Sequence, residues 1–354
     1  FTHLFSEKSD LTFRVFADHT TRTSPAAKNP LNYEVITYDA DIQYHFPIGK
    51  IQNIIVGASY RYMGDITNNL IFSPPNKLMP LANAFLQDEI MCIPDLLKLT
   101  IGSKISNNVF TGIEIQPSAR IAYTPNENHT VWTSVSRAVR TPSRFDADLI
   151  TPTGETYTPL GFVSENVIAY ELGYRTKSMT NLFLSFATFY NQYTDLRSFN
   201  TYTNSATPTI IANGQKADSW GGEVYSNYQA TSWWRLRFGY NYFEKNISST
   251  SPTVLSISNN IEGVDPKHQF TFQSIMNLPK YFSFDLTGRY VDALNSTPPV
   301  TITPAYFTFD IRLAKQFDHL EVSVVGQNLL EDEHFEIGLY SIPRSIYGKV
   351  VCRF

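Results

Sequence analysis

Three arginines stand close together in the sequence, at Arg137, Arg140 and Arg144, where a predicted strand ends. A guanidinium group forms paired hydrogen bonds with carboxylates and phosphates, so these residues are suited to holding an anion. One hypothesis is a cationic patch beside the path of a ligand. The other, which we favour, is a set of salt bridges at the rim of the fold that holds neighbouring segments together.

A second group of polar residues could bind a cation. The predicted loop after Leu330 carries carboxylate and imidazole ligands at Glu331, Asp332, Glu333, His334 and Glu336. These residues are adjacent in sequence and lack the spacing of a metal site. We therefore interpret the segment as a solvated acidic loop and predict no metal site.

The sequence contains no catalytic arrangement. It lacks a glycine-rich phosphate loop, a His-Glu-x-x-His pair and a paired cysteine motif. No nucleophile can be placed with a base and an orienting group, so we predict a protein that is not an enzyme and has no cofactor.

The net charge of −4 argues against binding of nucleic acid. Cys92 and Cys352 are interpreted as isolated thiols, although a disulfide is possible in an oxidising compartment.

Alternating apolar and polar residues predict the strands that position these side chains. From Tyr281 to Val291 one face is apolar and the other carries Asp285 and Arg289. The segment from Ala305 to Ala314 puts Phe309 opposite Asp310 and Arg312, and the segment from Trp233 to Phe243 puts aromatic residues opposite Arg235 and Arg237. Charges fall on one face, with Asp88 as an exception that we place at the rim. The predicted polar face is lined by Arg235, Arg237, Asp285, Arg289, Asp310 and Arg312.

The 354 residues contain about 16 such segments, and the links between them alternate between short turns and long loops. No run approaches the ~18 apolar residues that a spanning helix requires. A strand with a wet face and a dry face, and no helix to cover the dry one, fits a barrel with lipid outside and water inside. We therefore predict an all-β fold, an antiparallel transmembrane β-barrel. In the last strand the alternation continues to an aromatic residue, Phe354, which fits the rim of such a barrel.

Several motifs resemble TonB-dependent outer-membrane receptors. The end of the chain carries Val324-Val-Gly-Gln-Asn-Leu-Leu330, then Ile342-Pro-Arg-Ser-Ile-Tyr-Gly-Lys349 and a terminal aromatic residue. An earlier strand and loop reads Ser136-Arg-Ala-Val-Arg-Thr-Pro142. With the segments at 189–198 and 213–224, the resemblance covers most of residues 81 to 354.

The resemblance implies active uptake of a scarce ligand, such as an iron-siderophore complex or cobalamin, across the outer membrane of a Gram-negative bacterium. It implies that residues 1–354 are the C-terminal part of a 22-stranded barrel, because neither a plug domain nor a TonB-contacting box is found here. The implied partners are the TonB-ExbB-ExbD system, the barrel-assembly machinery, which reads Phe354, and lipopolysaccharide. In this setting Arg137, Arg140 and Arg144 would contact the ligand or the plug. The alternative is a free-standing passive porin, because 16 strands can close an aqueous barrel.

Overall fold

The structure is a computed structural model that describes residues 1–23, 32–67, 71–150, 157–158, 161–201, 210–250, 255–256, 264–294, 303–337 and 340–353. Sixteen strands of eight or more residues form one sheet. They are β2 (Ser9–Thr23), β3 (Asn32–Ile48), β4 (Gln52–Thr67), β6 (Leu81–Ile93), β7 (Leu97–Asn108), β8 (Gly112–Asn126), β9 (His129–Arg140), β10 (Glu165–Met179), β11 (Leu182–Thr201), β12 (Ile210–Thr231), β13 (Trp234–Ser249), β15 (His268–Leu278), β16 (Phe282–Val291), β17 (Tyr306–Gln316), β18 (Leu320–Gln327) and β21 (Ser345–Cys352). The predicted number of long strands is confirmed.

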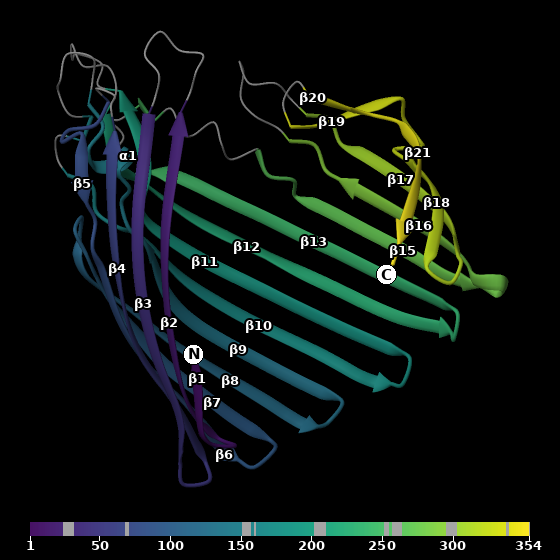
Figure 1. Cartoon of the computed structure of the whole chain (residues 1–354), viewed down its shortest axis with the longest axis horizontal. Coiled ribbons are helices and arrows are strands. Elements are labelled where there is room, and N and C mark those ends of the chain that lie inside the picture. Colours follow the sequence, from purple (N-terminus) through teal and green to yellow (C-terminus); the bar gives the residue numbers. More distant parts are fainter. Residues whose placement is uncertain are drawn as a thin grey trace.

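Each long strand pairs antiparallel with its neighbours in this order, from β2–β3 to β18–β21. The sheet curls, with the short turns gathered at one end and the long connections at the other (Figure 1). Within the described residues no pairing joins β21 to β2, so the curled sheet stays open along one side. The predicted alternation of short and long links is observed with one exception, the short link of residues 109–111 between β7 and β8.

The sequence did not predict several short elements. These are β1 (Thr2–Ser6), which pairs with β2, then β5 (Asn76–Leu78), α1 (Arg144–Ala147), β14 (Leu255–Ser256), the 3-10 turn η2 (Pro279–Tyr281), and the hairpin β19 (Glu333–Ile337) with β20 (Tyr340–Pro343). Most of them lie in the long connections, where no period-2 pattern exists. None of the helices in the described ranges has the length and the apolarity needed to cross a membrane.

The pairing registers give the sheet two chemically different faces. Asp285 lies opposite Arg312, Arg235 lies opposite Ile275, and Ile275 lies opposite Asp285, so these charged residues share one face. The same registers place Arg237, Arg289 and Asp310 on that face, which we call the polar face. Hollows of about 660 and 390 Å³ are lined largely by side chains of the polar face, which makes it the concave one.

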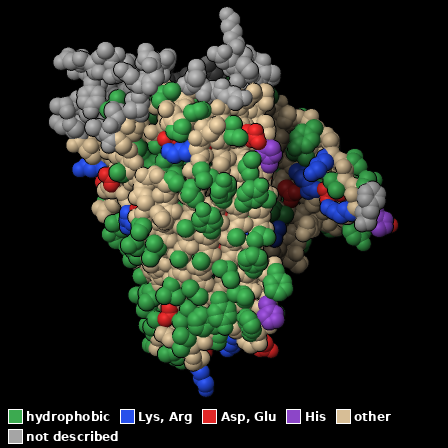
Figure 2. All heavy atoms as spheres, turned by 60° about the vertical axis from the view of Figure 1, so that its left-hand side comes forward, with side chains coloured by type: hydrophobic (Ala, Val, Ile, Leu, Met, Phe, Trp, Pro, Cys, Tyr) green, Lys and Arg blue, Asp and Glu red, His purple; other side chains and the backbone are tan. Residues whose placement is uncertain are grey.

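Large apolar side chains cover the opposite face. Phe307, Leu313, Val324 and Val350 are each more than a third exposed, although they belong to strands in the middle and at the end of the sheet. Hydrophobic groups with few charges between them spread over the outer surface in Figure 2. Asp88 shares this face close to the turn that follows β6, where Gln52 donates a hydrogen bond to it at 3.1 Å. Exposure on this scale matches a surface solvated by hydrocarbon.

Aromatic rings on the polar face occupy the space beside glycines of the neighbouring strand. The pairs are Phe85 over Gly57, Trp132 over Gly173 and Phe189 over Gly221. A Cβ built on Gly173 would stand 2.0 Å from the Trp132 ring, so only a residue without a side chain leaves room for this ring. The arrangement keeps bulky rings against the wall.

The two faces predict different responses at adjacent positions of β17. We expect Phe309→Arg to destabilise the folded protein in a bilayer by about 2–4 kcal/mol if Phe309 lies near the midplane, because a charge there faces hydrocarbon. Asp310→Ser should have a much smaller effect. The measurement is the free energy of unfolding by urea from lipid vesicles, and equal losses in the two variants would show that the faces are wrongly assigned.

The contact between Trp132 and Gly173 gives a second prediction. Gly173→Ala should displace the ring and destabilise the protein by about 1–3 kcal/mol, as overpacking does elsewhere. Gly64→Ala is the matched control, because a Cβ built on Gly64 has no heavy atom within 4 Å. Urea unfolding and the tryptophan emission maximum provide the readouts. The same substitution in a Trp132→Ala background should cost little, and an undiminished loss there would contradict the assigned contact.

Candidate functional site

The connection between β9 and β10 folds back over the polar face. Arg144 of α1 contacts Asp65 of β4, although β6, β7 and β8 lie between β4 and β9 in the sheet. Asp65 lies on the polar face. It pairs with Val35 of β3, and the Thr37–Met63 pair of the same face follows two positions away. Backbone hydrogen bonds from Ser73 to Asp148 and from Ile150 to Ile71 tie the connection to the segment before β5. The connection therefore lies on the concave side beside β4 and β5, at the end with the long loops (Figure 1).

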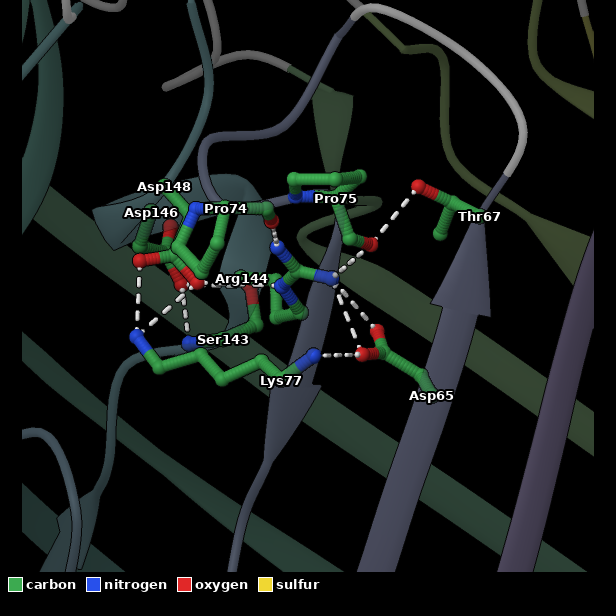
Figure 3. A network of polar contacts seen from close by, with 9 residues as sticks. All are labelled: Asp65, Thr67, Pro74, Pro75, Lys77, Ser143, Arg144, Asp146 and Asp148. Carbon is green, nitrogen blue, oxygen red and sulfur yellow. Dashed lines mark hydrogen bonds and ion pairs between the residues drawn. The ribbon is translucent and has the colours of Figure 1, made fainter.

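Arg144 is the centre of this arrangement (Figure 3). Its side chain is 5% exposed, and one terminal nitrogen donates to both carboxylate oxygens of Asp65 at 2.9 and 3.0 Å. The Nε atom donates to Asp148 at 3.0 Å, and the terminal nitrogens also donate to the carbonyl oxygens of Pro74 and Pro75. Such a buried guanidinium is held because hydrogen bonds and opposite charges offset its loss of water.

Lys77 joins the same network from β5. Its ammonium group lies 2.7 and 3.0 Å from the two oxygens of Asp148, and its backbone N–H donates to Asp65 at 3.1 Å. Thr67 at the end of β4 donates to the carbonyl of Pro75 at 2.9 Å. Asp148 thus contacts two cations, Lys77 and Arg144. Asp65 contacts Arg144 and the backbone N–H of Lys77. Together these contacts fix α1 relative to β4 and β5 (Figure 3).

Asp146 organises the other side of α1. It is fully buried, and it accepts hydrogen bonds from the N–H and the hydroxyl of Ser143, both at 2.9 Å. Arg140 and Arg197 each approach it to 3.1 Å. This geometry begins the helix at Ser143, because the carboxylate satisfies an N–H group that the helix leaves free.

The protonation of Asp146 follows from these contacts. Burial by itself raises the pKa of a carboxyl group, but the hydrogen bonds from Ser143, Arg140 and Arg197 outweigh it and leave the pKa of Asp146 below its usual value of 3.8. Because the folded pKa is depressed, the stabilisation is complete above the usual value. It is lost as the pH falls through the folded pKa, so Asp146 is ionised at neutral pH and its contacts with Arg140 and Arg197 are ion pairs.

The charges of the network balance. Its cations are Lys77, Arg140, Arg144 and Arg197, and its anions are Asp65, Asp146, Asp148 and Glu165. A region with equal numbers of both signs offers no surplus positive charge to an anionic ligand. The geometry is that of a clamp on the connection, as the salt-bridge interpretation expects.

Of the three arginines singled out in the sequence, Arg137 lies apart from the other two. Arg137 and Arg140 are three residues apart on the unbroken β9–β10 ladder, so they point to opposite faces. Arg137 lies on the apolar face near the rim, where it donates to Asn166 and to the carbonyl of Ile115 and lies 3.7 Å from Glu114. Arg140 and Arg144 join the clamp. Contact of any of the three with a ligand or a plug stays a prediction.

The six charged residues predicted to line the lumen share the polar face. Arg312 links Asp285 at 2.9 Å and Glu321 at 2.6 Å, and Arg353 approaches Glu321 to 3.5 Å, which makes a charge ladder across the last four strands. Asp310 accepts a hydrogen bond from the N–H of Asn328 at 2.9 Å. Arg235 and Arg237 lie one above the other on β13, and the Nε atom of each is buried without a hydrogen-bond partner. That water fills the space beside them stays a prediction.

The interpretation of the last long loop as fully solvated was wrong in part. His334 is 5% exposed, its ring lies 4.4 Å from that of Tyr306, and its Nε2 lies 3.0 Å from Glu336. Glu336 also pairs with Arg289 of the polar face. The hairpin β19–β20 therefore packs inward, because its acidic residue meets an arginine of the wall, whereas Glu331, Asp332 and Glu333 are exposed.

Two further sequence predictions concern thiols and metals. Cys92 and Cys352 are both free and exposed, as isolated thiols should be. Within the described ranges no cluster of three or more ligating side chains could hold a metal ion. Phe354, the predicted assembly signal, lies outside the described residues.

One sequence pattern could have pointed to the clamp. Ser143-x-x-Asp146 is a helix-capping pattern that could have identified α1. Asp65, Lys77 and Asp148 have no such signal, because Asp65 and Arg144 are 79 positions apart and no periodicity relates them.

The fold and its two faces define a membrane β-barrel wall with an inward-folded connection. A family model described as "TonB dependent receptor-like, beta-barrel" matches residues 2–329, so the chain belongs to this family. Among curated protein sequences, none matches the chain.

Solved structures of three receptors are similar to this chain. The FrpB iron transporter of Neisseria meningitidis, F5-1 variant, has a TM-score of 0.79 at 14% identity and covers 98% of this chain and 61% of its own. The siderophore receptor PirA of Acinetobacter baumannii has a TM-score of 0.74 at 15% identity, with 98% and 60% covered. A G324V mutant of the ferric enterobactin receptor PfeA of Pseudomonas aeruginosa has a TM-score of 0.74 at 14% identity, with 98% and 59% covered. The chain thus shares their fold and spans about three fifths of their length.

The clamp predicts a large effect of one substitution. Arg144→Met should destabilise the protein by about 3–5 kcal/mol, because it leaves Asp65 and Asp148 buried with less compensating charge. Arg14→Met is the matched control: Arg14 is 68% exposed and 3.7 Å from Asp41, and loss of such a pair costs about 1 kcal/mol or less. Urea unfolding measures both. Protease cleavage between residues 141 and 164 should also become faster in Arg144→Met alone, and equal losses in the two variants would rule out the clamp.

Proposed function

We propose that this chain is the barrel wall of an outer-membrane receptor that imports a scarce ligand, an iron-siderophore complex or cobalamin. The observation that carries the proposal is the family match over residues 2–329. The named functions of the similar structures, an iron transporter and two siderophore receptors, favour iron over cobalamin.

The geometry is compatible with a gated path. The polar face provides a wall that water and polar ligands tolerate, and the clamped connection lies across it at the end with the long loops. In barrels of this kind the long loops face the outside of the cell. A ligand arriving from outside would therefore meet the β9–β10 connection before it meets the rest of the wall.

Energy coupling belongs to the whole protein. Because the chain spans about three fifths of the solved receptors, the TonB-ExbB-ExbD system, a plug and the closing strands enter only as proposed partners. The barrel-assembly machinery and lipopolysaccharide are proposed as partners on the same footing, as is a multi-pass location in the outer membrane of a Gram-negative bacterium.

A passive porin is the competing function. The observation that favours it is the count of sixteen long strands, which is enough to enclose an aqueous channel. A porin would pass small solutes down their gradients without an energy source and would not saturate at low ligand concentration.

Uptake in cells separates the two functions. The protein that carries this chain is expressed in cells without their own iron-chelate and cobalamin receptors, with and without TonB. We expect saturable accumulation of a radiolabelled ferric siderophore or of cobalamin that disappears without TonB. Accumulation that is independent of TonB and linear in concentration would support the porin and refute the receptor. Vector-only cells and cells with the Arg14→Met variant serve as the controls.

A further inference from the structure

A cavity of about 450 Å³ lies between α1 and the wall strands at the end with the long loops. Its lining is largely apolar and aromatic, with Met63, Phe72, Met79, Leu81, Phe110 and Phe145 among the contributing side chains. Met79 is almost completely buried, whereas Phe145 and Val109 at the rim are each 42% exposed. We call this cavity the apolar pocket.

The apolar pocket differs from the rest of the concave side. The hollow of about 660 Å³ between β6 and β10 is lined by charged and polar side chains, including Glu89, Lys98, Arg120 and Glu171. The strand registers place Met63 and Leu81 on the same face as those residues. Arg61, two positions from Met63, pairs with Leu81, and Gln87, six positions from Leu81, pairs with Gly102 of β7. An apolar surface on the polar face is therefore a local feature.

Two polar side chains of the lining, Asn108 and Arg144, already have partners. The side-chain oxygen of Asn108 accepts from the N–H groups of Phe110 and Thr111, and its nitrogen donates to the carbonyl of Gly112. Arg144 is engaged by Asp65 and Asp148. A charged group in this pocket would lose its water against a largely apolar lining and find the guanidinium of Arg144 already paired, which is unfavourable.

The pocket is also preformed. Its roof is the segment from Thr141 to Phe145, which the buried pair of Arg144 and Asp65 holds against β4. Its volume lies in the range of pockets that hold small molecules, roughly 300–1,000 Å³. A docked polypeptide segment would bury backbone N–H and C=O groups that need partners, and the committed polar atoms of the lining do not supply them.

We propose that the apolar pocket binds an uncharged aromatic or aliphatic group of the imported ligand, an assignment that rests on the proposed receptor function. Burial of such a group against Phe72, Phe110 and the flexible Met63 removes apolar area from water on both sides. The exposed rim at Val109 and Phe145 provides the entrance from the loop side. The pocket thus selects ligands by an apolar part, and the clamp keeps it open without a ligand.

The test uses the protein that carries this chain in lipid nanodiscs, with 4-(trifluoromethyl)benzyl alcohol as a neutral aromatic probe and 4-(trifluoromethyl)benzoate as its charged counterpart. Fluorine NMR line broadening, corrected with empty nanodiscs, gives the affinities. We expect the alcohol to bind and the benzoate to bind at least about tenfold more weakly. Equal binding of the two probes would overturn the proposal.

Substitutions locate the binding. Val109→Trp places an indole at the rim, and Thr141→Trp does so from the roof; each should weaken binding of the alcohol at least about tenfold. Ile113→Trp is the matched control, because Ile113 is 69% exposed on the apolar face and outside the lining, and its affinity should stay within about twofold of the unsubstituted protein. Undiminished binding in either pocket variant that folds would refute the assignment.

The two proposals can fail separately. TonB-dependent uptake without any binding of the neutral probe would leave the receptor function standing and remove the apolar pocket as a binding site. Binding of the probe that Val109→Trp abolishes, in cells that accumulate neither ferric siderophore nor cobalamin, would keep the pocket and remove the receptor function.

Discussion

The hydrogen bonding of backbone groups between neighbouring strands is the constraint on which the rest of this structure depends. In hydrocarbon no water is available to a free N–H or C=O group, so a chain that crosses with strands must pair each of them. The ladders from β2 to β21 meet this demand over sixteen long strands. Among the long strands of the described residues, β21 lacks a second neighbour and β2 pairs beyond β3 only with the short β1, so closure of the wall depends on pairing at these two edges.

Once the strands are paired, the side chains of one face must suit lipid and those of the other face must suit a polar environment. The apolar face can expose Phe307, Leu313 and Val350 because lipid covers such groups without cost. The polar face collects charges that need partners, and it supplies them across strands, as in the ladder from Asp285 through Arg312 to Glu321. Glycines on this face leave room for rings of the neighbouring strand, as Gly173 does for Trp132.

Charge pairing on the polar face also recruits the long connections. Arg144 and Asp146 fix the β9–β10 connection, and Glu336 brings the last hairpin onto Arg289. The clamp has equal numbers of positive and negative groups, and its centre at Arg144, Asp65 and Asp146 is buried. The apolar pocket lies beside this clamp, which fixes the segment from Thr141 to Phe145 against β4. Structural and functional roles are in this way divided between adjacent residues.

The sequence alone determined the long strands, their number and their two faces, because alternation with a period of two is a local property that each segment carries by itself. It also implied that Arg137 and Arg140, three positions apart on one strand, face opposite sides, although their closeness in sequence favoured a single cluster. Only the tertiary structure decided that Arg144 meets Asp65, that His334 is buried against Tyr306, and that α1 roofs an apolar pocket. These contacts join loops to strands over tens of residues, and loops have no repeating pattern from which a partner can be inferred.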